Sequence, residues 1–434
     1  MNGACVYRKL GIDSVMIRLI VTVAVFGCLM RDRAAADFKT FRGRHITLQS
    51  DTGTTESLTD LVESFDASVS QWERMLDLPD GKLDSWHVRA FVMEQPDRFR
   101  GSGDLPQSLD FQYGYAMPGV IWVRLQPSQY YTRHLLLHEG VHALAIDQFG
   151  GTGPSWFSEG VAELLSVHRG QGDEIQIGTI PADKNEVPYW GRFKLLSQAR
   201  DEAKIPNLSS LLRLPNRLDG DVESYGWCWL AGSLLTQYPE YRPIWLKTAR
   251  DGLDVSESFT ESFRKSVAPQ WPILQARWRI LTQTADYGFD WSRERVDLSI
   301  KDPLSRDSEL RLNVAADKGW QSTGVRFAPG TKLSIQASGR CSVNQIPKPW
   351  ISEPAGVTIH YANGRPLGQL LVCVLPNLSN EEEFVDPLKV IPVAPQAEIV
   401  VDNHCWILFR INDDLSDLGD NRGGYEVTVR TSQD

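Results

Sequence analysis

The chain is 434 residues long, 42% of them hydrophobic, and carries a formal net charge of −10 at pH 7. A chain of this length and apolar content can bury a substantial core, and we expect two domains behind an N-terminal appendage. The acidic charge argues against a nucleic-acid partner, because binding to phosphates needs a basic surface and no basic stripe compensates the carboxylates.

Residues 1–36 have the pattern of a signal peptide. Basic residues precede an apolar run over 19–30, and three alanines ending at Ala36 provide an A-x-A cleavage site. The run is shorter than the ~20 residues needed to span a bilayer. We therefore expect a secreted or periplasmic protein with no stable membrane span after cleavage. A lipid anchor at Cys28 is the less favoured alternative.

The mature chain is expected to contain two domains of different classes. Residues 37–290 combine β-like runs with long helical patterns and predict an α+β domain. Residues 291–309 are polar and predict a linker, and 310–434 show short strands between Gly, Pro and Asn turns, as in an all-β sandwich. The clearest elements of the first domain are strands at 45–48, 87–92 and 119–125 and helices at 58–76 and 129–147.

Four cysteines remain after the expected cleavage. Cys228 lies among aromatic residues and is expected to be a buried thiol. The other three, Cys341, Cys373 and Cys405, lie in the C-terminal third, where an oxidising compartment would allow one disulfide.

The motif with the clearest chemistry is HEGVH, which begins at His138 in the helix expected over 129–147, with Ser128 as its N-cap. Histidines at i and i+4 project from one face of a helix, so His138 and His142 can reach a single metal ion. Glu139 lies beside them, where a carboxylate can take a proton from metal-bound water. The alternative is an ordinary helix whose histidines bind nothing.

A catalytic zinc site needs a third protein ligand and an open position. The metzincin pattern would place histidine at 148 and glycine at 145, but the chain has Gln148 and Ala145. Glycines instead break the chain, and Pro154 suits the first turn of a second helix. On that helix we expect Glu159 to be the third ligand and Glu163 to orient a ligating imidazole. A solvated surface position is the alternative for each of these two glutamates.

The pair of motifs HEGVH and WFSEGVAE resembles the gluzincin metallopeptidases, in particular the peptidase MA-like group with its HExxH and W-x-x-E-G-x-A-E signature. The resemblance covers most of the expected first domain and is specific over 134–168. It implies a zinc ion with a general base beside it, the ligands being His138, His142 and Glu159 and the base Glu139.

The same resemblance implies two further features. In such enzymes a tyrosine steadies the oxyanion of the tetrahedral intermediate, and Tyr225 lies at the corresponding place, with Tyr189 and Tyr131 as competitors. The strand at 119–125 would resemble the edge strand along which an extended peptide is laid. The amine-binding glutamate of the exopeptidase motif is absent from 115–119, so an exopeptidase is not implied.

The second informative stretch is the Asp-, Asn- and Gly-rich segment 412–425. Carboxylate and amide oxygens recur every few residues, and this density of hard ligands suits Ca²⁺, which takes about six to eight of them. The spacing is not that of an EF-hand loop. On composition alone, an ordinary turn between strands is the alternative.

This segment resembles the calcium loop of the small galactose-binding bacterial lectins of the LecA type. The resemblance spans 310–431 and is specific only in the loop. The side chains with which those lectins hold sugar have no clear counterpart around 352–356, so galactose specificity is not implied. The calcium ligands that the resemblance implies are Asp413, Asp417, Asp420 and Asn421.

The sequence thus predicts a multi-domain protein, an α+β gluzincin-type zinc peptidase domain followed by an all-β, lectin-like sandwich. Its expected activity is zinc-dependent hydrolysis of peptide bonds in a polypeptide substrate, with calcium as a second cofactor and a glycan or glycoprotein as a second ligand. One alternative is a carbohydrate-binding protein whose inactive first domain keeps zinc for stability alone. Another is a zinc hydrolase that acts on a non-peptide amide.

Overall fold

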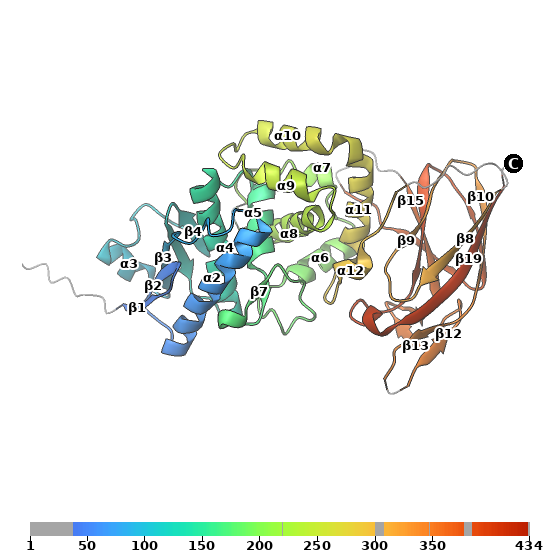
Figure 1. Cartoon of the computed structure of the whole chain (residues 1–434), viewed down its shortest axis with the longest axis horizontal. Helices are drawn as coiled ribbons and strands as arrows, with labels where there is room; N and C mark the ends of the chain where they lie inside the picture. The colour runs from blue at the N-terminus through green and yellow to red at the C-terminus, as the bar shows by residue number, and fades with distance from the viewer. Residues whose placement is uncertain (1–37, 219, 300–307, 347, 377–383, 433–434) are drawn as a thin grey trace, which may run out of the picture.

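The computed structural model describes residues 38–218, 220–299, 308–346, 348–376 and 384–432. A helical body with a small sheet at its N-terminal end lies beside a β-rich C-terminal region (Figure 1). The expected signal peptide, Cys28 included, lies outside the described residues. Within the described ranges, no helix is both long enough and apolar enough to cross a membrane.

The N-terminal region opens with a five-stranded sheet in the order β1-β2-β3-β5-β4. The three central strands are parallel, and β1 and β4 pair antiparallel at the two edges. The strands expected at 45–48, 87–92 and 119–125 correspond to β2, β3 and β5. The bounds are β1 (Lys39–Arg42), β2 (Ile46–Ser50), β3 (Val88–Met93), β4 (Gly114–Met117) and β5 (Val120–Arg124).

The edge position expected for the strand at 119–125 is wrong. In the structure β5 lies between β3 and β4, and β4 is the free edge on that side of the sheet. Pro118 and Gly119 form a tight turn in which Gly119 has a φ of 66°, and Met117 pairs with Val120 across it. Proline followed by a glycine with positive φ is the signature of such a turn. The resulting hairpin covers β5 with β4.

Three helices form the frame of the candidate site. Helix α2 (Thr55–Met75) crosses over between β2 and β3, and Thr54 and Ser57 form a capping box at its start. Helix α4 (Gln129–Phe149) begins at the expected Ser128 cap, whose side chain accepts a hydrogen bond from the backbone N–H of Tyr131. Helix α5 (Ser155–Ser166) follows Pro154, which occupies the N-cap itself.

The rest of the region up to residue 299 is mainly helical, as expected, and its buried tryptophans belong to one large core. Its elements are α3 (Pro96–Ser102), β6 (His168–Arg169), η1 (Gly172–Glu174), β7 (Gln176–Ile177), α6 (Arg192–Asp201), α7 (Leu208–Leu211), α8 (Val222–Gln237), α9 (Arg242–Ala249), α10 (Glu257–Val267), η2 (Ala268–Gln270), α11 (Trp271–Thr284) and α12 (Trp291–Glu294).

The C-terminal region consists of two facing sheets with a common core. One is six-stranded, with β12-β11-β19-β10-β17 in order and β8 paired to β19; the other is four-stranded, in the order β16-β15-β18-β9. The bounds are β8 (Glu309–Ala315), β9 (Gln321–Phe327), β10 (Lys332–Ser338), β11 (Cys341–Val343), β12 (Trp350–Ser352), β13 (Val357–Ala362), β14 (Arg365–Leu367), β15 (Leu370–Pro376), β16 (Lys389–Val393), β17 (Gln396–Val400), β18 (Cys405–Ile411), η3 (Leu418–Asp420) and β19 (Arg422–Ser432).

All four described cysteines are buried free thiols. Cys228 therefore has the expected environment, but the disulfide expected in the C-terminal third is not formed. Cys373 and Cys405 lie on the neighbouring strands β15 and β18 but are not opposite each other. Cys373 pairs with Leu408, and Cys405 pairs with Pro376, so the two cysteines are three residues apart along the ladder. Cys341 belongs to the opposite sheet.

Residues 291–299, which we expected to begin a linker, pack against both regions. Glu294 of α12 and Arg410 of β18 form a buried ion pair, with Oε1 and Nη2 3.1 Å apart. Residues of α11 and residues 296 and 298 form a small core with the outer face of β15 and β18. The two regions therefore share an apolar interface and a buried ion pair.

Candidate metal centre

The candidate site is built where α4, α5 and α8 pack together. Helix α4 ends at Gly150, whose left-handed φ of 77° terminates it, and α5 begins after a short loop. Helix α8 approaches α5 closely at Gly160, where a Cβ atom would lie 2.8 Å from the carbonyl oxygen of Cys228. The glycine of the WFSEGVAE motif thus allows α8 to bring Tyr225 next to the histidines of α4.

Two overlapping groups of metal-ligating side chains lie between α4 and α5, and both contain His138. We call His138, His142 and Glu159 the outer group. We call His134, His138 and Glu163 the inner group. Among the described residues, these are the groups of three or more His, Cys, Asp or Glu whose ligand atoms all lie within 4.8 Å of one another.

In the outer group, the three ligand atoms form a compact triangle. His138 Nε2 lies 3.1 Å from His142 Nε2 and 3.2 Å from Glu159 Oε2, and His142 Nε2 lies 3.5 Å from the same oxygen. Two ligands about 2.0–2.1 Å from a tetrahedral zinc ion are about 3.3–3.4 Å apart. The triangle therefore has the dimensions of a three-ligand zinc site.

The outer group is buried but reaches the surface on one side. The side chains of His142 and Glu159 are 13% and 18% exposed, whereas that of His138 is 8% exposed. Glu159 Oε2 is buried and faces the two imidazole nitrogens of its own group at 3.2 Å and 3.5 Å. A buried carboxylate needs a compensating cation, which is either a protonated imidazole or a metal ion that these three atoms would hold.

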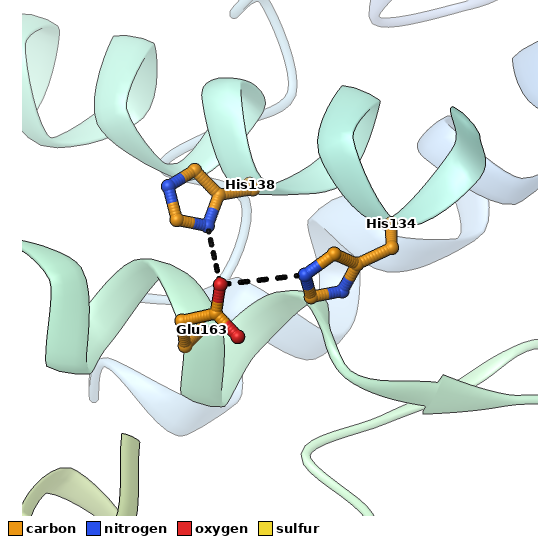
Figure 2. A group of neighbouring side chains, drawn as sticks. All are labelled: His134, His138 and Glu163. Atoms are coloured by element: carbon orange, nitrogen blue, oxygen red, sulfur yellow. Dashed lines mark ion pairs between the residues drawn. The ribbon is translucent and has the colours of Figure 1, made fainter. Parts of the chain in front are cut away.

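The inner group has a different environment. Glu163 Oε1 lies 3.5 Å from both His134 Nε2 and His138 Nδ1, so the carboxylate faces two imidazoles of α4 at once (Figure 2). The guanidinium of Arg192 makes a two-pronged contact with the same carboxylate, at 2.7 Å and 3.2 Å. A metal ion here would have to displace a buried cation, so we interpret the inner group as an ion-paired cluster around the Glu163 carboxylate.

The charges of the site agree with this division. Burial alone would raise the pKa of Glu163, but the Arg192 charge together with charge and hydrogen bonds from His134 and His138 outweighs burial and holds that pKa well below its usual range. Burial likewise opposes charge on His138, but hydrogen bonds and charge from Glu159 and Glu163 raise its pKa to about 10. Without a metal, a proton on His138 therefore compensates the outer carboxylate.

Glu139 is adjacent to the outer group and only 7% exposed. Burial raises its pKa, although the neighbouring His142 and His138 oppose that shift. Gly114 of the edge strand β4 makes room for its side chain, because a Cβ atom at this position would lie 2.5 Å from Glu139 Oε1. The free strand edge therefore passes directly beside the expected general base.

Tyr225 lies near the outer group on α8, as its expected role requires. Its ring centroid is 6.3 Å from that of His138, in an edge-on arrangement. The guanidinium of Arg192 lies over the Tyr225 ring at 5.6 Å. Burial raises the pKa of the Tyr225 hydroxyl, and the nearby carboxylates add to that shift, so the group is protonated at neutral pH. Of its competitors, Tyr131 hydrogen-bonds to Arg192 and Tyr189 is 67% exposed.

The segment expected to bind calcium connects β18 to β19. Asp413 and Asn421 are buried, and the Asn421 amide donates to Asp413 Oδ2 at 2.8 Å. Asp420 Oδ2 accepts from the backbone N–H of Gln345, while one oxygen each of Asp420 and Asn421 is buried without a partner. Asp417 is exposed, and the three aspartates do not form a cluster within 4.8 Å among the described residues. Two unpaired buried oxygens in one loop fit a hard cation.

Sequence reasoning missed two residues of the site. Arg192 follows a glycine at the start of α6, and nothing local to it indicates a partner on α5. Gly114 lies in a strand that was not recognised. The one available signal for Arg192 was a single charge next to the aromatic residues at 189–193, where a buried arginine requires an acidic partner.

Comparisons with known proteins give partial information. No family model and no curated protein matches the chain. Among solved structures, it is similar to a PllA-like lectin, the EclA N-terminal domain, at 20% identity over 28% of this chain and 96% of that one, with a TM-score of 0.21. PliG of Aeromonas hydrophila, a periplasmic inhibitor of g-type lysozyme, matches at 7% identity over 32% and 99%, with a TM-score of 0.18. These scores are too low to assign a function.

Proposed function

We propose that the protein is an exported zinc-dependent metallopeptidase of the gluzincin type. The observation that supports this most directly is the outer group, in which two imidazole nitrogens and one buried Glu159 oxygen lie 3.1–3.5 Å from one another. Two imidazoles and one carboxylate are a donor set that zinc accepts in catalytic sites. The partial exposure of His142 and Glu159 leaves room for a fourth, exchangeable position.

The chain's own groups then have separate tasks. When bound, zinc would act as a Lewis acid and lower the pKa of a coordinated water. Glu139 accepts the proton, and its burial makes the carboxylate a stronger base than a solvated one. The same side chain later delivers the proton to the leaving amine.

The oxyanion and the substrate backbone have separate partners. Tyr225 keeps its hydroxyl proton at neutral pH and can donate it in a hydrogen bond to the developing oxyanion. The free edge of β4 offers unpaired backbone groups beside Glu139, and an extended polypeptide can add to such an edge as a further strand. Main-chain pairing would give affinity without reading a particular sequence.

The decisive experiment combines metal analysis with digestion of an unbiased peptide library. Wild-type protein should contain one zinc per chain and cleave internal peptide bonds. Glu139→Gln should keep the zinc and lose about 10²–10⁴-fold in kcat, the usual contribution of a general base. A zinc-bound wild type that cleaves no peptide would favour the alternative, a structural zinc domain, or a hydrolase of non-peptide amides.

For the C-terminal region we propose a calcium-dependent, carbohydrate-binding-like domain. The buried oxygens of Asp420 and Asn421 without partners support a cation in this loop. A glycan or glycoprotein is the expected ligand, and the domain would keep the peptidase near it. Screening the intact protein on a glycan array with calcium and with a chelator tests this proposal, and calcium-independent binding would contradict it.

A further inference from the structure

We infer that Arg192 is a positioning residue, which holds both a zinc ligand and the candidate oxyanion donor in place. This inference rests on the proposed zinc site. Arg192 is only 3% exposed and lies on α6, outside the helices that carry the metal-ligating side chains. It contacts the site through two side chains, Glu163 and Tyr225.

The contact with Glu163 fixes the orientation of the ligand His138. Glu163 Oε1 faces His138 Nδ1, the ring nitrogen opposite the one directed at the outer group (Figure 2). A carboxylate at this nitrogen holds the imidazole ring and sets its tautomer. The Glu163 side chain is only 1% exposed, so water does not compensate its charge and a cation of the protein must do so.

The two hydrogen bonds from Arg192 to Glu163 hold the carboxylate in one orientation. Nε and Nη2 of Arg192 each face a different oxygen of Glu163, which fixes the plane of the carboxylate as well as its position. A lysine would supply the charge but not the planar fork. The orientation of Glu163, and through it of His138, therefore depends on the guanidinium group.

The Arg192 guanidinium also contacts Tyr225, the candidate oxyanion donor. The Arg192 guanidinium lies over the Tyr225 ring at 5.6 Å, which is within the range of a cation–π interaction. Tyr225 in turn lies edge-on to His138. One buried cation thus fixes the relative positions of a ligand and of a hydroxyl that must act on the same reacting carbonyl.

The test compares Arg192→Met, Arg192→Lys, Glu163→Gln and the double variant Arg192→Met with Glu163→Gln. Zinc affinity is measured by competition with a chromophoric chelator, and ligand geometry by the visible spectrum of the cobalt-substituted protein. Arg192→Met should lose about 10–100-fold in zinc affinity, as expected when a partner of a ligand is removed. The double variant should melt at a higher temperature than either single variant, because neither buried charge is left unpaired.

Arg192→Lys separates charge from geometry. It should restore most of the zinc affinity, but kcat at saturating zinc should remain low with KM little changed, because the fork and the contact with Tyr225 are lost. If Arg192→Met fails to fold, Arg192→Lys and the double variant still carry the test.

Arg200 provides a matched control on the same helix. Its side chain is partly buried and bonds to the carbonyl oxygens of Thr282 and Ala285, away from the site. Arg200→Met should lower the melting temperature and leave zinc affinity and the cobalt spectrum unchanged. Equal effects of Arg200→Met and Arg192→Met on zinc affinity, or wild-type affinity in Arg192→Met, would overturn the inference.

The inference and the proposed function fail in distinguishable ways. Zinc affinity and the cobalt spectrum are measured without any peptide substrate. A wild type that binds no zinc overturns the proposed function before any variant is made. A zinc-bound wild type with unaffected Arg192 variants overturns the inference alone.

Discussion

The outer and inner groups are two His-His-Glu clusters made from the same pair of helices, yet only one is suited to a metal. Both combine two histidines of α4 at i and i+4 with one glutamate of α5, and both hold their nearest nitrogen–oxygen pairs at 3.2–3.5 Å. They differ in their next neighbour. The inner carboxylate faces a buried guanidinium, whereas the outer one faces the two imidazoles of its own group and is partly accessible to solvent.

The difference teaches that ligand identity and spacing do not by themselves define a metal site. A buried carboxylate must be compensated by a cation, and the fold can supply either an arginine side chain or a set of ligands for a metal ion. The two groups share His138, so the inner group can hold in place a side chain that we propose as a zinc ligand of the outer group. Matched substitutions in the outer and inner groups test whether only the outer group binds a metal ion.

The largest expected difference is between His142→Ala and His134→Ala. His142 is a predicted ligand of the outer group, so its removal should abolish stoichiometric zinc and all peptidase activity. His134 is fully buried in the inner group, so His134→Ala should cost about 2–4 kcal/mol of stability but keep one zinc per chain. Elemental analysis and thermal unfolding measure the two effects. Loss of zinc in both variants would show that the groups act as one site.

The next effect concerns the base rather than the ligands. Gly114→Ala should push Glu139 aside, because the added Cβ would lie 2.5 Å from its carboxylate oxygen. A misplacement of a catalytic group by about 1 Å can cost about 10²-fold in rate, so kcat should fall while zinc content stays constant. Gly101→Ala is the control, since a Cβ there meets nothing within 4 Å. An unchanged kcat in Gly114→Ala would show that the close approach of β4 does not set the position of Glu139.

The pH dependence of zinc affinity sharpens the comparison further. The neighbouring carboxylates raise the pKa of His138 to about 10 in the metal-free protein, so below that pH a proton must leave before zinc binds. The pKa of Glu159 is lowered to about 2, so this group contributes nothing above pH 4. Zinc affinity should therefore rise by about tenfold per pH unit between pH 6 and 8 from His138 alone. Competition titrations at several pH values check the slope, and a flat profile would contradict it.

The smallest expected effect extends the comparison to the loop between β18 and β19. Calcium should raise the melting temperature of the wild type by a few degrees, as for a ligand that binds only the folded state. Asp420→Asn should reduce this shift, because Asp420 contributes one of the unpaired buried oxygens. Asp414→Asn is the control, an exposed position in the same loop that is not a predicted ligand. Equal shifts in both variants would place the cation elsewhere.

Several elements of the first region could be predicted because their signals are local. The spacing of apolar residues predicts α2, and Ser128 with the periodicity after it predicts α4. The edge of the sheet could not be predicted in this way, because pairing between strands is set by the tight turn before β5 and by contacts far apart in the chain. The packing of 291–299 against β18 was missed for the same reason.

The sequence by itself determined that His138 and His142 lie together, because a helix places residues i and i+4 on one face whatever surrounds it, and it placed Glu139 next to His138 in the chain. It also placed two glutamates one turn apart on the next helix. Only the tertiary structure decided their roles. The crossing of α4 and α5 directs Glu159 at the Nε2 atoms of His138 and His142 and directs Glu163 at Nδ1 of His138. Helix α6 places Arg192 against Glu163. That choice depends on how the helices pack, which no local spacing encodes.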